Sequence, residues 1–142
     1  MKLVYAKYQN EIFTVINIRK TVFILEQDVD VEEELDDLDY IADHYLLSHD
    51  DKYVATARII YSDNSATIGR VAVLKEERKK GYASYLMKEL IEIIKESESE
   101  VIHIGAQKQA LPFYEQLGFV VSGDLYLDAN IEHYPMELRL WS

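Results

Sequence analysis

The chain has 142 residues, of which 49% are apolar and 29% are charged, and its formal net charge at pH 7 is −11. This size and composition predict one globular domain over residues 1–142, with no apolar run of the ~18 residues that a membrane span needs and no secretory signal. The negative charge argues against nucleic acid as a partner, and the zero cysteines exclude disulfides and thiolate metal sites and are compatible with the cytoplasmic location that we expect.

The N-terminal region is predicted to contain a strand, a helix and an acidic segment. Apolar and polar residues alternate between Lys2 and Tyr8, which predicts a strand, and Asn10 is expected to cap a helix. The apolar residues of that helix, from Ile12 to Phe23, recur at helical spacing. Residues 28–43, which we call the acidic segment, then hold nine carboxylates in an irregular order.

Three interpretations of the acidic segment stay open. In the first, the segment is a solvated, mobile loop. In the second, its negative field attracts a cationic ligand such as a polyamine, an aminoglycoside or a lysine side chain. In the third, it binds calcium. Asp28-x-Asp30-x-Glu32 begins like an EF-hand loop, but Glu33 stands where that loop needs glycine. We therefore expect no metal site.

The rest of the chain alternates strands and helices. Turn residues at 49–52 and 62–65 separate apolar strands and predict an antiparallel meander. A strand, a helix and a further strand then imply a right-handed parallel crossover. The fold class is therefore α/β (α+β), with a mixed, mostly antiparallel sheet of six to seven strands and helices on both faces. The predicted strands are 45–48, 53–61, 66–74, 101–106, 119–127 and 133–141, and the predicted helices are 82–97 and a short one near Tyr114.

A basic turn joins the strand Val71 to Leu74 to the helix that Gly81 opens. Unpaired N–H groups and a partial positive charge make helix N-termini good phosphate sites. The cations at this turn stand out in an acidic chain and suggest that a polyanion binds there. Neither the P-loop nor the three-glycine dinucleotide fingerprint fits the sequence. The cations are Lys75, Arg78, Lys79 and Lys80.

Two motifs resemble the GNAT superfamily of acyl-CoA N-acetyltransferases. Arg78-Lys79-Lys80-Gly81-Tyr82-Ala83 resembles its pyrophosphate loop, Gln/Arg-x-x-Gly-x-Gly/Ala. Ala110 to Phe119 resembles its short helix with Phe-Tyr that ends in Leu-Gly-Phe. Local chemistry agrees, because Pro112 suits a first helical turn and Gly118 suits a C-terminal cap.

The resemblance implies an acetyl-CoA site. The pantetheine arm would pair with the backbone of Val71, Ala72 and Val73. Tyr114 matches the family tyrosine that protonates the departing thiolate, although a half-buried helix tyrosine is the alternative. The pyrophosphate would be held by Arg78 and by the backbone of Lys79, Lys80, Gly81, Tyr82, Ala83 and Ser84.

The general base departs from the common family pattern. Thr67-Ile68-Gly69-Arg70 lacks the glutamate that many members carry on the strand before the loop. His133, in Ile131 to Met136, resembles the His-x-x-Met of the ElaA-type group and of glyphosate N-acetyltransferases, in which the histidine is the base. Histidine commonly titrates near pH 6.5, which suits this role, but a histidine packed at the sheet end is equally compatible with the sequence.

The first helix also resembles the ElaA-type group, in Arg19-x-x-x-Phe23-x-x-Glu26-Gln27. Glu26 could therefore orient the acceptor amine, or it could be an exposed helix-end residue. His44 also has a counterpart in that group, and we interpret it as structural. Family members often dimerise, so a homodimer is compatible with the resemblance.

The sequence therefore predicts an enzyme that moves an acetyl group from acetyl-CoA directly to the amine of a small molecule. The alternative is a non-catalytic acyl-CoA sensor or interaction domain with the same fold. The absent strand carboxylate favours the sensor, whereas Tyr114 and His133 favour the enzyme.

Overall fold

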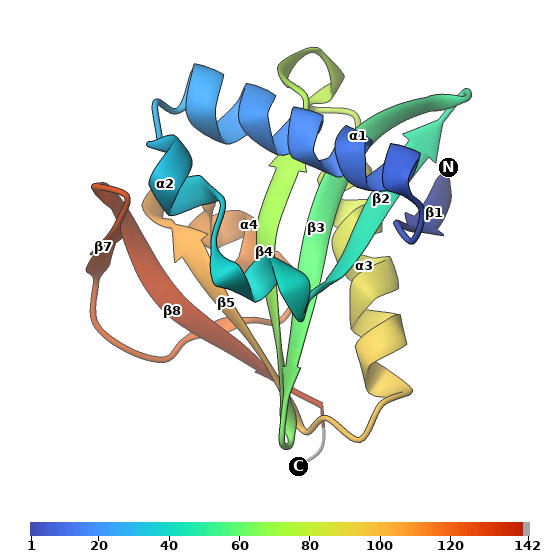
Figure 1. The fold of residues 1–142 in the computed structure, drawn as a ribbon. Coiled ribbons are helices and arrows are strands. Elements are labelled where there is room, and N and C mark those ends of the chain that lie inside the picture. The colour runs from blue at the N-terminus through green and yellow to red at the C-terminus, as the bar shows by residue number, and fades with distance from the viewer. Residues whose placement is uncertain (141–142) are drawn as a thin grey trace.

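Figure 1 shows the computed structural model, which describes residues 1–140 as a sheet of eight strands with helices on both faces. The strand order is β1-β2-β3-β4-β5-β8-β6, and β7 pairs with β8. Every pairing is antiparallel except β4 with β5, so the predicted mixed sheet is confirmed. The strands are β1 Lys2–Tyr5, β2 Asp43–His49, β3 Lys52–Ser62, β4 Ser65–Val73, β5 Val101–Gln107, β6 Val120–Val121, β7 Tyr126–Asp128 and β8 Ile131–Arg139.

Residues 1–140 form four α-helices, and the first of them changes its winding. Helix α1 continues beyond its last residue as a π-helical segment, Lys20–Glu26. The helices are α1 Gln9–Arg19, α2 Val31–Glu34, α3 Tyr82–Lys95 and α4 Leu111–Gln116, and 3₁₀ turns lie at Asp37–Tyr40, Lys75–Glu77 and Lys108–Ala110.

Two local predictions at the N-terminus were wrong. The first strand ends at Tyr5 because the N–H groups of Lys7 and Tyr8 instead donate to Glu11 Oε1, at 3.0 and 2.9 Å. Glu11 thereby supplies the carboxylate of a capping box, and α1 begins one residue after Tyr8. Asn10 lies inside the helix and is not its cap.

The predicted strand 119–127 forms two short strands, β6 and β7, which raises the number of strands to eight. The chain leaves the sheet at Ser122, whose N–H donates to Pro135 O at 2.8 Å. A Cβ added to Gly123 would lie 2.8 Å from Pro135 Cγ, so a side chain at this turn would collide with β8. Trp141, at the predicted end of the last strand, lies outside the described residues.

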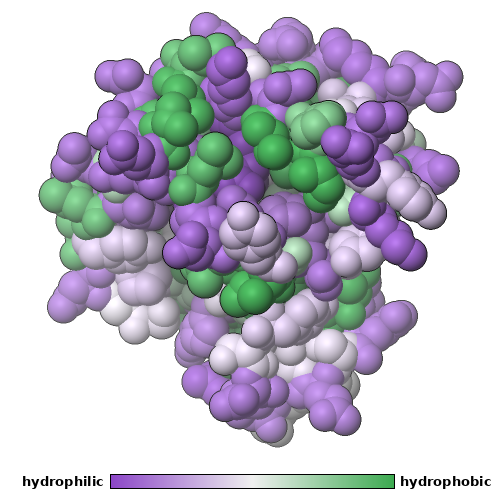
Figure 2. Space-filling model, in the orientation of Figure 1, coloured by the Kyte–Doolittle hydropathy of each residue, from purple (hydrophilic) through white to green (hydrophobic). Residues whose placement is uncertain are grey.

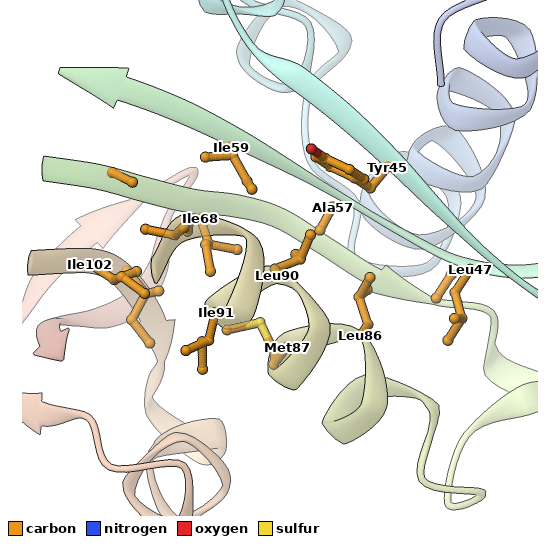
Figure 3. Close-up of a cluster of buried hydrophobic side chains, with 14 of the residues drawn as sticks. Tyr45, Leu47, Ala57, Ile59, Ile68, Leu86, Met87, Leu90, Ile91 and Ile102 are labelled. Carbon is orange, nitrogen blue, oxygen red and sulfur yellow. The ribbon is translucent and has the colours of Figure 1, made fainter. Parts of the chain in front are cut away.

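The larger core lies between the sheet and α3. Figure 3 shows side chains of α3 pointing toward those of the strands, with Leu86, Met87 and Leu90 facing the sheet. These three side chains are fully buried, and each such burial contributes about 1.5–3 kcal/mol. A second cluster, which includes Val15, Ile18 and Val22, packs the first helix on the opposite face. The predicted helices on both faces are therefore present.

The parallel pair β4–β5 opens into a gap. Pairing joins Ser65–Thr67 to Val101–His103 and stops there, although both strands continue. On its other side β4 carries a bulge, because two residues, Arg70 and Val71, stand opposite one residue of β3. Arg70 takes a φ of +52°, in the left-handed region. The strands therefore diverge toward the end of β4, where the basic loop begins.

The acidic segment is an ordered part of the fold, so its interpretation as a solvated mobile loop was wrong. Arg19 Nε donates to Glu34 Oε1 at 2.7 Å, and the Arg19 and Glu34 side chains are each 2% exposed. Arg58 forms a bidentate salt bridge with Asp36, in which Nη1 donates to Oδ1 at 2.7 Å and Nη2 donates to Oδ2 at 3.0 Å. Because these carboxylates neutralise buried guanidinium groups, the segment is held against α1 and the sheet.

Figure 2 shows the face that bears α1 and the acidic segment as mostly hydrophilic, with its apolar residues in separate groups. Helix α1 has exposed apolar side chains, among them Phe13 and Ile16. Within residues 1–140, no helix combines the length and the apolar character that crossing a membrane requires.

Candidate active site

A cavity of about 690 Å³ occupies the gap between β4 and β5. Residues from the acidic segment, the basic loop and β8 all line it, although they are far apart in the sequence. Most of the predicted site residues meet here, whereas Lys80 and Glu26 are not among the lining residues. The lining residues that the sequence had indicated are Val71, Ala72, Val73, Arg78, Lys79, Gly81, Tyr82, Ala83, Ser84, Tyr114 and His133.

The loop that opens α3 has the conformation of an anion cradle. Gly81 takes a φ of +84° and Lys79 a φ of +63°, which turn the chain sharply into the helix. Within residues 1–140, the N–H groups of Tyr82, Ala83 and Ser84 have no hydrogen-bond partner. These donors and the positive end of the helix dipole suit a phosphate group.

Ion pairs reduce the positive charge at this loop below what its sequence indicates. Lys80 Nζ donates to Glu77 Oε1 and Lys52 Nζ to Glu77 Oε2, each at 3.0 Å. Arg78 pairs with Glu26, whose two carboxylate oxygens lie 2.5 and 2.7 Å from its Nη atoms. Among the described residues, Lys75 and Lys79 are the loop cations that make no ion pair.

The edge of β4 presents backbone groups to the gap. The N–H of Leu74 donates to Val54 O of β3 at 3.1 Å, so the groups of Leu74 point toward β3. Alternate residues of a strand direct their N–H and C=O groups to opposite sides. Val73 therefore faces the gap, and its carbonyl accepts a 3.0 Å hydrogen bond from Arg78 Nε. An extended polar chain could pair with this edge as an added strand.

Tyr114 reaches the cavity from α4. Its ring lies edge-on to Phe113 and Phe119, with centroids 5.0 and 6.0 Å away. Burial raises the pKa of the Tyr114 phenol to about 12. The hydroxyl is therefore protonated at neutral pH and able to donate a hydrogen bond.

His133 reaches the cavity from the end of β8 that pairs with β7. The residue is 9% exposed, and its Nδ1 lies 2.7 Å from Ile131 O. Because a carbonyl oxygen only accepts, we assign the proton of the neutral ring to Nδ1, which leaves the Nε2 lone pair available. This is the tautomer that a base directed at the cavity requires.

Tyr126 is a cavity residue that the sequence did not indicate. It stacks on His133 with a centroid distance of 5.6 Å, and its hydroxyl lies 2.2 Å from where a Cβ on Gly105 would stand. Gly105 therefore leaves the space that Tyr126 fills. A two-residue turn at Ala129-Asn130, with both φ values positive, places Tyr126 opposite His133. Only this weak turn signal could have indicated the contact.

The end of the first helix also reaches both sides of the gap. Gln107 Nε2 of β5 donates to Gln27 Oε1 at 3.0 Å, and Glu26 holds Arg78 at the other side. The hydrogen bonds from Arg78 hold the pKa of Glu26 below its ordinary value. The carboxylate for which we predicted an acceptor role is thus ion-paired with Arg78 of the basic loop.

Comparisons with known proteins find relatives in sequence and in fold. The model of the acetyltransferase (GNAT) domain matches residues 23–140. The uncharacterized N-acetyltransferase YjcF of Bacillus subtilis is 34% identical over 137 residues, which span 96% of this chain and 98% of the relative. Escherichia coli ElaA superposes with a TM-score of 0.82 at 25% identity, over 97% of this chain and 98% of that one. A GNAT family acetyltransferase from Elizabethkingia anophelis with acetyl-CoA bound has the same fold, with a TM-score of 0.76 at 16% identity, covering 98% of this chain and 97% of that one.

Proposed function

The chain belongs to the GNAT acetyltransferase family, and we propose that it transfers an acetyl group from acetyl-CoA directly to the amine of a small molecule. The observation that carries the proposal is the open gap between β4 and β5. One cavity there combines a phosphate cradle at Gly81, a strand edge at Val73 and two groups suited to proton transfer.

The residues present fit the coenzyme. The free N–H groups that begin α3, with Lys79 and Arg78 beside them, would hold its pyrophosphate. The backbone of Val71 to Val73 would pair with its pantetheine arm. When bound, acetyl-CoA would supply a thioester whose carbonyl carbon accepts the amine nitrogen while the carbon–sulfur bond breaks.

His133 and Tyr114 would divide the proton transfers of this reaction. Ordinary amines are protonated at pH 7 and must lose a proton before or during attack. Nε2 of His133 would take that proton, and Nδ1–H stays directed at Ile131 O. The Tyr114 hydroxyl would donate to the sulfur as negative charge develops on it, because its raised pKa keeps the proton in place until then. The presence of both groups in one cavity favours an enzyme over a coenzyme sensor.

The charge balance around the cavity supports a cationic acceptor. Arg19, Arg58 and Arg70 are matched by Glu34, Asp36 and Asp39 in one ion-pair cluster. Two further carboxylates that line the cavity have no cation partner among the described residues. These are Glu33 and Asp128. Their field would attract a positively charged amine, whereas the cradle at α3 suits the anionic coenzyme.

Acetyl-CoA is expected to raise the melting temperature of the protein by roughly 5–10 °C. At 100 times its Kd, a ligand adds about 2.7 kcal/mol to the free energy of unfolding. Differential scanning fluorimetry measures the shift, with ATP as the polyanion control. A shift of equal size with ATP, or none with either ligand, would contradict the proposed coenzyme. CoA release with a panel of neutral and cationic amines then tests turnover and the charge of the acceptor.

Tyr114→Phe is expected to lower kcat about 10- to 100-fold and to leave the Kd of acetyl-CoA within about twofold. The change removes the hydroxyl and keeps the ring that packs between Phe113 and Phe119. Steady-state kinetics and calorimetric titration measure the two quantities. Tyr61→Phe, on β3 and outside the cavity, is the matched control. An unchanged kcat would assign Tyr114 to packing alone.

A further inference from the structure

We infer that Glu26 acts on the coenzyme through Arg78 and does not bind the acceptor amine. This inference rests on the proposed function, because it concerns how the same site receives acetyl-CoA. Glu26 lies at the end of the π-helical segment, 52 residues before Arg78 in the sequence. It is a positioning residue in this assignment, since it would contact neither substrate.

The contacts between the two side chains are those of a fixed pair. Arg78 Nη1 lies 2.5 Å from Glu26 Oε2, and Nη2 lies 2.7 Å from Oε1. A third hydrogen bond, from Nε to Val73 O at 3.0 Å, holds the inner end of the same guanidinium. Three separate contacts therefore fix its position and its plane.

The pair leaves Arg78 able to bind an anion. A guanidinium has five N–H donors, and Glu26 and Val73 engage three of them, so one donor on each Nη atom remains. Each carboxylate oxygen of Glu26 accepts one hydrogen bond from Arg78 and keeps a second lone pair. Only Arg78 has free donors, however, and an anion at the adjacent α3 cradle needs donors.

The neighbouring residue extends this arrangement across the cavity. Gln27 accepts a hydrogen bond from Gln107 of β5, so adjacent side chains of the helix end contact the two sides of the gap. The width of the gap beyond the last paired residues of β4 and β5 is therefore linked to the position of this helix end. Loss of Glu26 would remove this contact from the side of the gap that carries the basic loop.

The direction of the effect separates positioning from charge. Glu26 is negative, so its removal would by charge alone tighten the binding of an anionic coenzyme. The pair is about one-third exposed, with side chains 36% and 30% accessible, and salt screens such charges over about 8 Å at 0.15 M. Positioning should dominate, because an unpaired Arg78 would have to be ordered by the coenzyme itself.

Calorimetric titration of acetyl-CoA tests the inference on four proteins: the unmodified chain, Glu26→Ala, Arg78→Ala and the double variant. We expect Glu26→Ala to weaken the Kd by about 5- to 10-fold, Arg78→Ala by at least as much, and the double variant by no more than Arg78→Ala alone. The weakening should persist at 0.5 M salt. Glu92→Ala, which breaks an exposed ion pair with Lys95 on α3, is the matched control and should leave the Kd unchanged.

Three outcomes would decide against the inference. An acetyl-CoA Kd that is unchanged or tightened in Glu26→Ala would overturn it. The inference would also be overturned if Glu26→Ala weakened the Kd by the same factor in the unmodified chain and in the Arg78→Ala variant. A raised KM for the amine at an unchanged acetyl-CoA Kd would instead restore the acceptor role. If the unmodified chain bound no acetyl-CoA, the proposed function itself would be wrong. A circular dichroism spectrum typical of a folded α/β protein would show that the absence of binding is not caused by unfolding.

Discussion

His133→Ala is expected to lower kcat/KM by roughly 100- to 10,000-fold, the range in which a positioned general base contributes. The change removes the ring nitrogen that would accept the proton of the amine, while the strand edge and the α3 cradle stay intact. The Kd of acetyl-CoA should therefore change little. Steady-state kinetics with the best amine of the panel, together with titration of acetyl-CoA, separates the two effects.

The pH dependence gives a second readout of the same variant. A histidine base works only when neutral, so kcat/KM of the unmodified enzyme should fall toward acid as the ring gains a proton. This acidic limb should be absent from the residual activity of His133→Ala. His103→Ala, a half-buried histidine of β5 outside the cavity lining, is the control. An acidic limb that survives in His133→Ala would assign the base to another residue.

The parts of the site that the sequence predicted are those in which one short segment carries the chemistry. Gly81 at the start of an amphipathic helix requires a particular backbone turn, and the helix end exposes donors whatever the remaining fold is. Tyr114 similarly follows a proline and precedes a glycine that fix the ends of its short helix. Local rules therefore sufficed to predict these two helices and the glycines at their ends.

The parts that the sequence did not predict depend on contacts between distant segments. The pairing of Glu26 with Arg78 joins two residues that look like a helix-end glutamate and a free loop cation when each is considered alone. Tyr126 reaches Gly105 only because β7 and β8 form a hairpin beside β5. Charge counts also mislead, since Lys80 and Arg78 are each neutralised by a carboxylate that only the fold brings near.

The acidic segment is the clearest case of a structure that depends on contacts between distant residues. Nine carboxylates in sixteen residues suggest a solvated loop, because their arginine partners lie on α1, β3 and β4. The small helix α2 and the following 3₁₀ turn form where Glu34, Asp36 and Asp39 meet those arginines. A segment that is polar in sequence therefore becomes one wall of the cavity.

Asp39→Ala is accordingly expected to lower the free energy of unfolding by about 3–5 kcal/mol, against a total of about 5–15 kcal/mol for a domain. Asp39 Oδ1 accepts from Arg19 Nη1 at 2.8 Å and from Arg58 Nη1 at 2.7 Å. The two arginine side chains are only 2% and 6% exposed. Glu34 and Asp36 remain as partners, but the cluster then holds three arginines and two carboxylates, so one buried positive charge is uncompensated. The melting temperature should therefore fall by roughly 10–15 °C.

Asp37→Ala provides a closely matched control, since Asp37 lies in the same 3₁₀ turn, carries the same charge and is exposed. It makes no ion pair among the described residues, so its loss should cost less than about 0.5 kcal/mol. Urea denaturation of both variants measures the difference. Equal destabilisation by the two changes would show that net charge, not the arginine cluster, holds the acidic segment in place.

The pH dependence of stability should follow the same contacts. Burial raises the pKa of Asp39, but the hydrogen bonds and the positive charges of Arg19 and Arg58 together outweigh this effect and hold the pKa below its ordinary value. A lowered folded-state pKa adds stability above the unfolded-state pKa of about 4, and this stability is lost as the pH falls through the folded value. The unmodified protein should therefore weaken steeply below pH 4, and Asp39→Ala should show a shallower decline. A decline of equal slope in both proteins would place the acid-sensitive carboxylates elsewhere in the fold.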